Sequence, residues 1–97
     1  MKPVRVHPDA EAESDGAFEY LWDQSQSAAL GFDAELRDAF SRLRSAPKMY
    51  AQYLHGTRRI LLVRYPYSVV FRELPRKIEI IAIAHAKRRP GYWRGRI

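Results

Sequence analysis

The sequence contains no cysteine, which excludes disulfide bridges, thiolate metal sites and a cysteine nucleophile. A chain that needs no oxidising compartment fits the reducing cytoplasm, and we expect it there. Long apolar runs are also missing. The longest, Ile80 to Ala84, is far below the roughly 20 residues of a membrane span. The N-terminus has no apolar stretch typical of a signal peptide, so we expect neither export nor membrane insertion.

Histidine is scarce as well, with three residues at His7, His55 and His85. His7 and His55 are isolated in sequence, without a second metal ligand at close spacing. The sequence also has no repeat, low-complexity segment or linker. We therefore predict no metal site and no cofactor, and one domain over residues 1–97, because this length supports a single core.

Acidic residues are rare in the second half of the chain. From His55 onward, eleven lysines and arginines are opposed only by Glu73 and Glu79, whereas the first half has nine acids and six bases. Nine of the eleven are arginines, whose planar guanidinium groups bind carboxylate or phosphate through two parallel hydrogen bonds. This distribution predicts a cationic surface for an anionic partner.

The first half reads as one strand followed by two helices. Residues 2–7 alternate in the period of a half-buried strand, and Pro8 starts a helix that we expect to run to about Leu30. Gly31 then serves as a left-handed cap, and a second apolar stripe ends before Pro47. The aromatic residues expected in the core are Phe18, Tyr20, Trp22, Phe32 and Phe40.

The second half is extended. Three strands are predicted over residues 60–63, 69–71 and 78–84, with short turns that make them an antiparallel meander. The tail from Lys87 to Ile97 has no periodicity and is expected across the sheet edge. The predicted fold is thus α+β: one sheet from the first strand and the meander, with the helical hairpin on one face and the other face free for a partner.

This order of elements and several local motifs resemble the RelE/ParE family of toxins, over nearly the whole chain. The motifs are His7-Pro8-Asp9-Ala10, Phe32 to Leu36, Leu43 with Pro47, Arg58-Arg59 before Ile60 to Val63, Tyr65 to Phe71, Ile81 to His85, and Arg88 to Trp93. The resemblance implies the toxin of a type II toxin–antitoxin system, as in plasmid stabilisation. Such a toxin inhibits growth until a cognate antitoxin binds it.

The family has two activities. RelE-like members cut messenger RNA on the ribosome, whereas ParE-like members inhibit DNA gyrase and are not known as hydrolases. If this chain were a nuclease, the catalytic candidates would be His85, Arg59, Arg64, Arg88 and Tyr92. Nuclease members, however, typically carry an arginine where this sequence has Ser68, and a hydroxyl cannot replace a cation at a developing phosphorane. Arg64 or Arg72 could compensate from a neighbouring position if strand alternation turns its side chain towards the site. We therefore favour the ParE-like, non-enzymatic interpretation.

Two sets of binding residues are expected. An acidic antitoxin segment that folds on binding would contact Arg58, Arg59, Arg72, Arg88 and Arg89. The target would contact the tail through Arg88, Arg89, Tyr92, Trp93, Arg94 and Arg96. For Tyr92 and Trp93, packing on the sheet is an alternative that we favour, and a structural role is the alternative for His85.

A third hypothesis is a basic nucleic-acid-binding module without toxicity. The sequence lacks the aromatic and glycine pattern of RNA-binding sheets, and neither helix has the basic face of a recognition helix. The sequence thus contains no motif that specifically supports this third hypothesis.

Overall fold

The computed structural model describes residues 1–97. Its elements are β1 (Val4–Val6), α1 (Pro8–Gln24), α2 (Gln26–Ser45), β2 (Arg58–Leu61), β3 (Tyr67–Glu73) and β4 (Ile78–His85), with single 3-10 turns at Pro47–Met49, Leu54–Gly56 and Arg94–Arg96. Neither helix is long and apolar enough to cross a bilayer.

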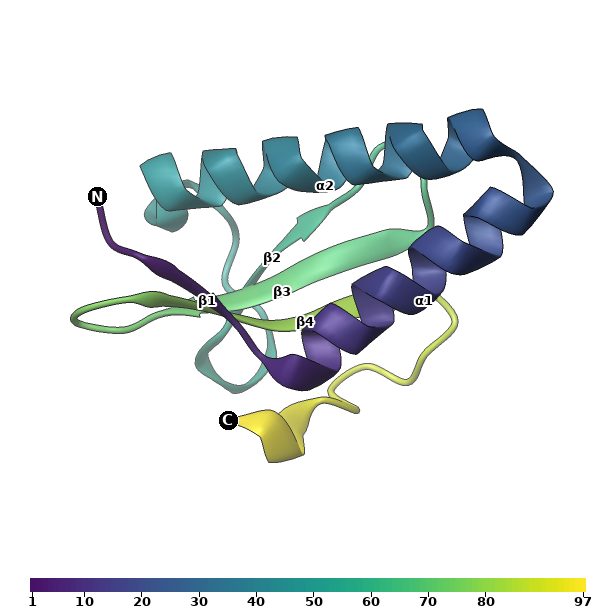
Figure 1. Ribbon diagram of the computed structural model, residues 1–97. Coiled ribbons are helices and arrows are strands. Elements are labelled where there is room, and N and C mark those ends of the chain that lie inside the picture. The colour runs from purple at the N-terminus through teal and green to yellow at the C-terminus, as the bar shows by residue number, and fades with distance from the viewer.

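The four strands form one mixed sheet in the order β1-β4-β3-β2. β2, β3 and β4 are an antiparallel meander, and β1 lies parallel to β4, with Val4 opposite Ile78. Both helices lie on the same side of this sheet, and the C-terminal segment lies on the other (Figure 1). The predicted α+β architecture, including the pairing of the first strand with the meander, is confirmed.

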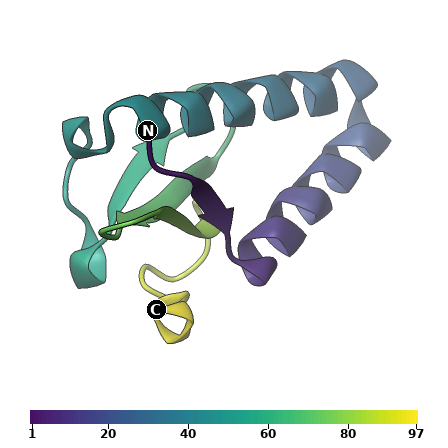
Figure 2. The same ribbon diagram turned by 60° about the vertical axis from the view of Figure 1, so that its left-hand side comes forward.

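The break between the helices is at Ser25, not at Gly31. Ser25 is extended (φ −166°, ψ 120°), and its hydroxyl accepts a hydrogen bond from the Ala28 amide at 3.3 Å, which makes it the N-cap of α2. The predicted first helix was therefore six residues too long. From this corner the helices open as a V above the sheet (Figures 1 and 2).

Gly31 lies inside α2, and position 31 requires a glycine because Tyr65 packs closely on that turn of the helix. A β-carbon at Gly31 would be 2.5 Å from the Tyr65 hydroxyl oxygen. That hydroxyl donates to the Ala28 carbonyl at 2.8 Å, and the Tyr65 ring packs edge-on against Phe32. Gly31 thus provides space for the Tyr65 hydroxyl. It does not end a helix, contrary to what the sequence had indicated.

Alanine at the two helical glycines is expected to act in opposite directions. Gly16→Ala should raise the free energy of unfolding by about 0.5–1 kcal/mol, because a β-carbon there meets nothing within 4 Å. Gly31→Ala should lower it, because displacing Tyr65 costs more than the gain in helix propensity. Thermal unfolding of both variants measures this difference. Equal stabilisation of the two would show that Tyr65 does not constrain the turn.

The main core lies between the helices and the sheet. It contains Ala10, Ala17, Phe32, Leu36, Ala39, Leu43, Leu62, Val69, Phe71, Ile78, Ile80 and Ile83. Phe40 packs against it. The prediction is wrong for Tyr20 and Trp22, which are 63% and 41% exposed. Both lie in the last two turns of α1, next to the corner at Ser25. This corner, where the two helices meet, projects beyond the sheet (Figure 2).

The second face of the sheet carries a smaller core of Val70, Ile81, Ala82 and Trp93. A bulge in β4 helps to form it: Val70 pairs with Ala82 and Phe71 with Ile80, so Ile81 is the additional residue. Trp93 is only 1% exposed. The prediction of a bare second face is therefore wrong, because Trp93 of the tail packs on it. The tail crosses this face, and its end reaches the edge of β4 through Arg96.

Candidate functional site: an arginine pocket on the second face

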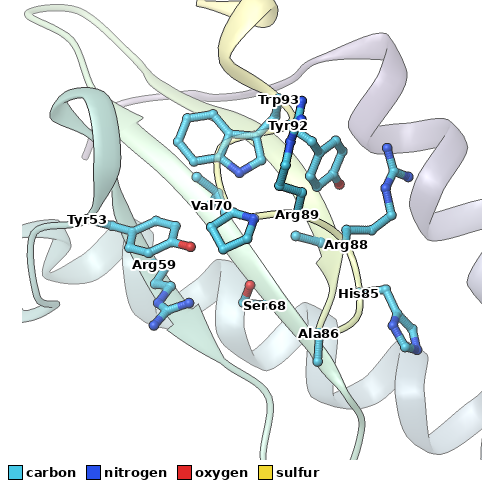
Figure 3. Close-up of a pocket in the computed structure, with 12 residues that line it drawn as sticks. Tyr53, Arg59, Ser68, Val70, His85, Ala86, Arg88, Arg89, Tyr92 and Trp93 are labelled. Atoms are coloured by element: carbon cyan, nitrogen blue, oxygen red, sulfur yellow. The ribbon is translucent and has the colours of Figure 1, made fainter.

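A small pocket lies on the second face, between β2, the start of β3 and the segment that follows β4. Its cavity is about 80 Å³. Arg59 comes from β2, Ser68 from β3, and Arg88 and Arg89 from the segment after β4, while Tyr53 closes the side next to β2 (Figure 3). Trp93 forms part of the wall, which ties the pocket to the packing of the tail.

Two of the pocket arginines are held by aromatic rings. The Arg59 guanidinium carbon lies 4.0 Å from the centroid of the Tyr53 ring, and that of Arg88 lies 3.8 Å from the centroid of Tyr92. Neither these two nor Arg89 belongs to any of the salt bridges of the structure. Cation–π stacking leaves the N–H groups of a guanidinium free to bind an oxyanion. The pocket is thus a positive site without an internal counter-ion.

The other predicted antitoxin-binding arginines are not part of this site. Arg58 alternates to the helix side of β2 and donates to the Tyr50 carbonyl at 2.7 Å. Arg72 pairs with Glu79, at 2.9 Å between Nη2 and Oε1, and Glu79 also binds Arg5. The single cationic surface that the sequence predicts is therefore divided: some arginines are free, and others stabilise the fold.

Four of the five nuclease candidates, Arg59, His85, Arg88 and Tyr92, line this pocket, but the His85 ring does not point into it (Figure 3). His85 follows Ala84 in β4 and therefore faces the opposite side of the sheet from Ser68, which pairs with Ala84. Its ring packs edge-on against Tyr67, at 5.0 Å between centroids, and points away from the pocket (Figure 3). Its Nδ1 accepts a hydrogen bond from the Lys87 amide at 3.0 Å. His85 and Arg59 thus lie on different faces of the sheet.

Arg64 is the one nuclease candidate outside the pocket, because it lies in the turn between β2 and β3. Its Nε is 3.6 Å from a Glu35 carboxylate oxygen, and Arg64 does not line the pocket. Glu35 in addition accepts the backbone amides of Val63 and Arg64. Arg64 therefore belongs to the contact between Glu35 of α2 and the turn that joins β2 to β3.

Tyr92 and Arg96 are bound by one carboxylate, that of Glu13 in α1. The Tyr92 hydroxyl donates to it at 2.5 Å, and Arg96 donates through both terminal nitrogens at 2.9 and 3.0 Å. Burial by itself would raise the pKa of Glu13, but hydrogen bonds from Arg96, Tyr92 and the Ile83 amide outweigh it and lower the pKa. Burial and the bond to Glu13 raise the pKa of Tyr92 far above its usual range. Tyr92 therefore remains a protonated donor.

The same two charged side chains also bind the outer side of β4. The Ile83 amide donates to Glu13 at 3.1 Å, and the Ile81 carbonyl accepts from Arg96 at 3.1 Å. Glu13 was not singled out from the sequence as a site residue. Sequence periodicity could not reveal this contact, because its partners lie about 70 and 83 residues away.

Of the predicted target-binding residues, Arg88 and Arg89 are exposed in the pocket and Arg94 is exposed in the last 3-10 turn. Trp93 and Arg96 are instead engaged in packing and in the Glu13 cluster. Tyr53, which orients Arg59, was not singled out from the sequence, and no local motif marks it. No group of three or more His, Asp or Glu side chains lies close enough together to hold a metal ion.

Comparison with known proteins assigns this chain to a class, the toxins of type II toxin–antitoxin systems. The family described as "ParE toxin of type II toxin-antitoxin system, parDE" matches residues 4–90. The chain belongs to the ParE toxin family. No curated protein matches it.

A solved structure has the same fold. It is described as a chromosomal ParDE toxin–antitoxin system from P. aeruginosa, is 21% identical in sequence, and superimposes with a TM-score of 0.78. The match covers 90% of this chain and 98% of that one. The predicted membership of the RelE/ParE toxins, closer to ParE, is confirmed, and the protein is a type II toxin.

Proposed function

We propose that this toxin arrests growth by binding DNA gyrase in the cytoplasm, without cleaving RNA, and that an acidic antitoxin segment neutralises it. The family match over residues 4–90 carries the proposal. The orientation of His85 supports the non-nucleolytic part, because its ring packs on Tyr67 and points away from the pocket that contains Arg59 (Figure 3). General base and phosphate-binding cations must act within hydrogen-bonding distance of the same phosphodiester.

The gyrase target is tested with purified toxin in two assays. Supercoiling of relaxed plasmid by gyrase should decrease as toxin is added, or cleaved gyrase–DNA complexes should accumulate. Toeprinting on translating ribosomes should show no new cuts in the message. Cleaved messages together with unchanged supercoiling would overturn the proposal. Normal growth of a bacterial host that expresses the toxin alone would contradict toxicity itself.

Antitoxin recognition would use the three arginines of the pocket. The solved relative is described as a toxin–antitoxin system, and we expect the antitoxin of this chain to place carboxylates against Arg59, Arg88 and Arg89. These groups have no internal counter-ion, so an acidic segment gains attraction without first breaking an existing ion pair. Arg58 and Arg72, which already have partners, should contribute less.

Alanine at Arg59, Arg88 and Arg89 together is expected to weaken antitoxin binding by on the order of 2 kcal/mol, or about thirtyfold. The salt dependence of the affinity should also become shallower. Calorimetric titration at two ionic strengths measures both effects. Arg76→Ala is the matched control, because Arg76 is exposed and lies outside the pocket. Unchanged affinity in the triple variant would remove the pocket from antitoxin recognition.

A further inference from the structure

The outer surface of α1 carries an aromatic pair, the half-buried Phe18 and the exposed Trp22. Contrary to the prediction from the sequence, Phe18 is not part of either core cluster. Phe18 and Trp22, one helical turn apart, stack at 5.8 Å between ring centroids with 25° between their planes. Trp22 is 41% exposed, while the other tryptophan, Trp93, is 1% exposed. An ordered, exposed tryptophan is characteristic of the anchor residues at protein interfaces.

A hollow next to this pair makes the surface uneven. It measures about 200 Å³ and lies between α1 and α2, lined by Ser14, Asp15, Phe18, Glu19, Phe32, Asp33 and Leu36. Phe18 stands between this hollow and the surface around Trp22. Ridges and hollows formed by two helices accept the side chains of a third helix, which repeat every three or four residues.

The charge beside the aromatic pair is uniformly negative. Asp15, Glu19 and Asp23 follow one another at intervals of one helical turn, and none of them belongs to a salt bridge. α1 has no lysine or arginine at all, and its last turn has no basic residue. Like charges at this spacing repel, and an acid at the C-terminal end of a helix also opposes the helix dipole. Lysine or arginine side chains of a partner would reduce the repulsion between these acids and their unfavourable interaction with the helix dipole.

We propose that this surface, defined by Asp15, Phe18, Glu19, Trp22 and Asp23, binds a basic amphipathic helix of a partner protein. Lysine or arginine side chains one turn apart would pair with the three acids and stack on Trp22, while aliphatic side chains would fill the hollow beside Phe18. The arginine pocket attracts acidic groups, so the two surfaces select partners of opposite charge. This inference does not depend on the gyrase proposal.

Binding is tested with the purified full-length chain and a synthetic helical peptide of leucine and lysine in amphipathic order. The peptide should shift the fluorescence of Trp22, and Trp22→Phe should remove this shift, since Trp93 is buried. Asp15→Asn, Glu19→Gln and Asp23→Asn combined should weaken binding at least tenfold in calorimetry. Glu11→Gln, an exposed acid of α1 outside the surface, should leave it unchanged.

Three results would overturn the proposal. One is equal affinity for the neutralised triple variant and the wild type. Another is equal binding of a control peptide in which glutamate replaces lysine. The third is salt-sensitive self-association of the chain in sedimentation that the triple substitution abolishes, because the occupant would then be a second copy.

Discussion

Trp93→Ala is expected to lower the free energy of unfolding by about 3–5 kcal/mol, the cost of deleting a large buried aromatic side chain. Trp93 contacts Val70, Ile81 and Ala82, and Tyr53 packs beside it at 6.1 Å between ring centroids. Its removal leaves the second face of the sheet without its main apolar cover. Chemical denaturation followed by circular dichroism measures the loss.

Trp22→Ala is the matched control for this substitution. Trp22 is partly exposed on α1, so its loss should cost on the order of 1 kcal/mol or less. A Trp93→Ala variant with wild-type stability and lost gyrase inhibition would instead assign Trp93 to target binding.

Glu13→Ala is expected to destabilise the protein by about 2 kcal/mol, less than a fully buried ion pair would lose, because both partners retain some exposure. The substitution leaves Arg96 and the Tyr92 hydroxyl without their acceptor and detaches the tail from α1. Glu11→Ala, an exposed acid two residues away, should change stability by no more than about 0.5 kcal/mol. Denaturation at neutral pH compares the two.

The pH dependence of stability provides a second measurement for Glu13. Its pKa in the folded protein lies below the ordinary value, which is about 4.3 for an unfolded chain. Its contribution is therefore complete above that ordinary value and is lost as the pH falls through the folded pKa. The stability of wild type should fall more steeply in this acidic range than that of Glu13→Ala. Parallel curves would exclude Glu13 as a source of acid sensitivity.

The fold was predictable where local pattern and burial agree. The β-branched residues of β4 and its short turns indicated the meander, and that strand is buried over Ile78 to Ile83. Helical content was also clear, but the break at Ser25 was missed because Gly31 is the stronger stop signal in a single sequence. The glycine is required by Tyr65, a residue distant in sequence, and no local pattern contains that information.

The candidate site was predictable in composition but not in arrangement. Sequence counts show an excess of arginine, yet strand alternation separates Arg58 from Arg59, and Glu79 engages Arg72. The burial of Trp93 depends on a bulge in β4 and on the path of an irregular tail. Such features arise from pairing between distant segments, and the periodicity of one segment does not specify them.

The shortness of β1 has a consequence for the behaviour of the protein at high concentration. β1 pairs only with Ile78 to Ile80, so on this side of β4 no strand lies beside Ile81 to His85, whereas β3 pairs with the other side. An uncovered, apolar strand margin recruits strands of other molecules and promotes aggregation. Glu13 and Arg96 cap Ile83 and Ile81 there. The last residues of the chain thus hinder the addition of strands from other molecules to β4. Proteolytic removal of this tail should therefore yield a chain that precipitates as ordered fibrils.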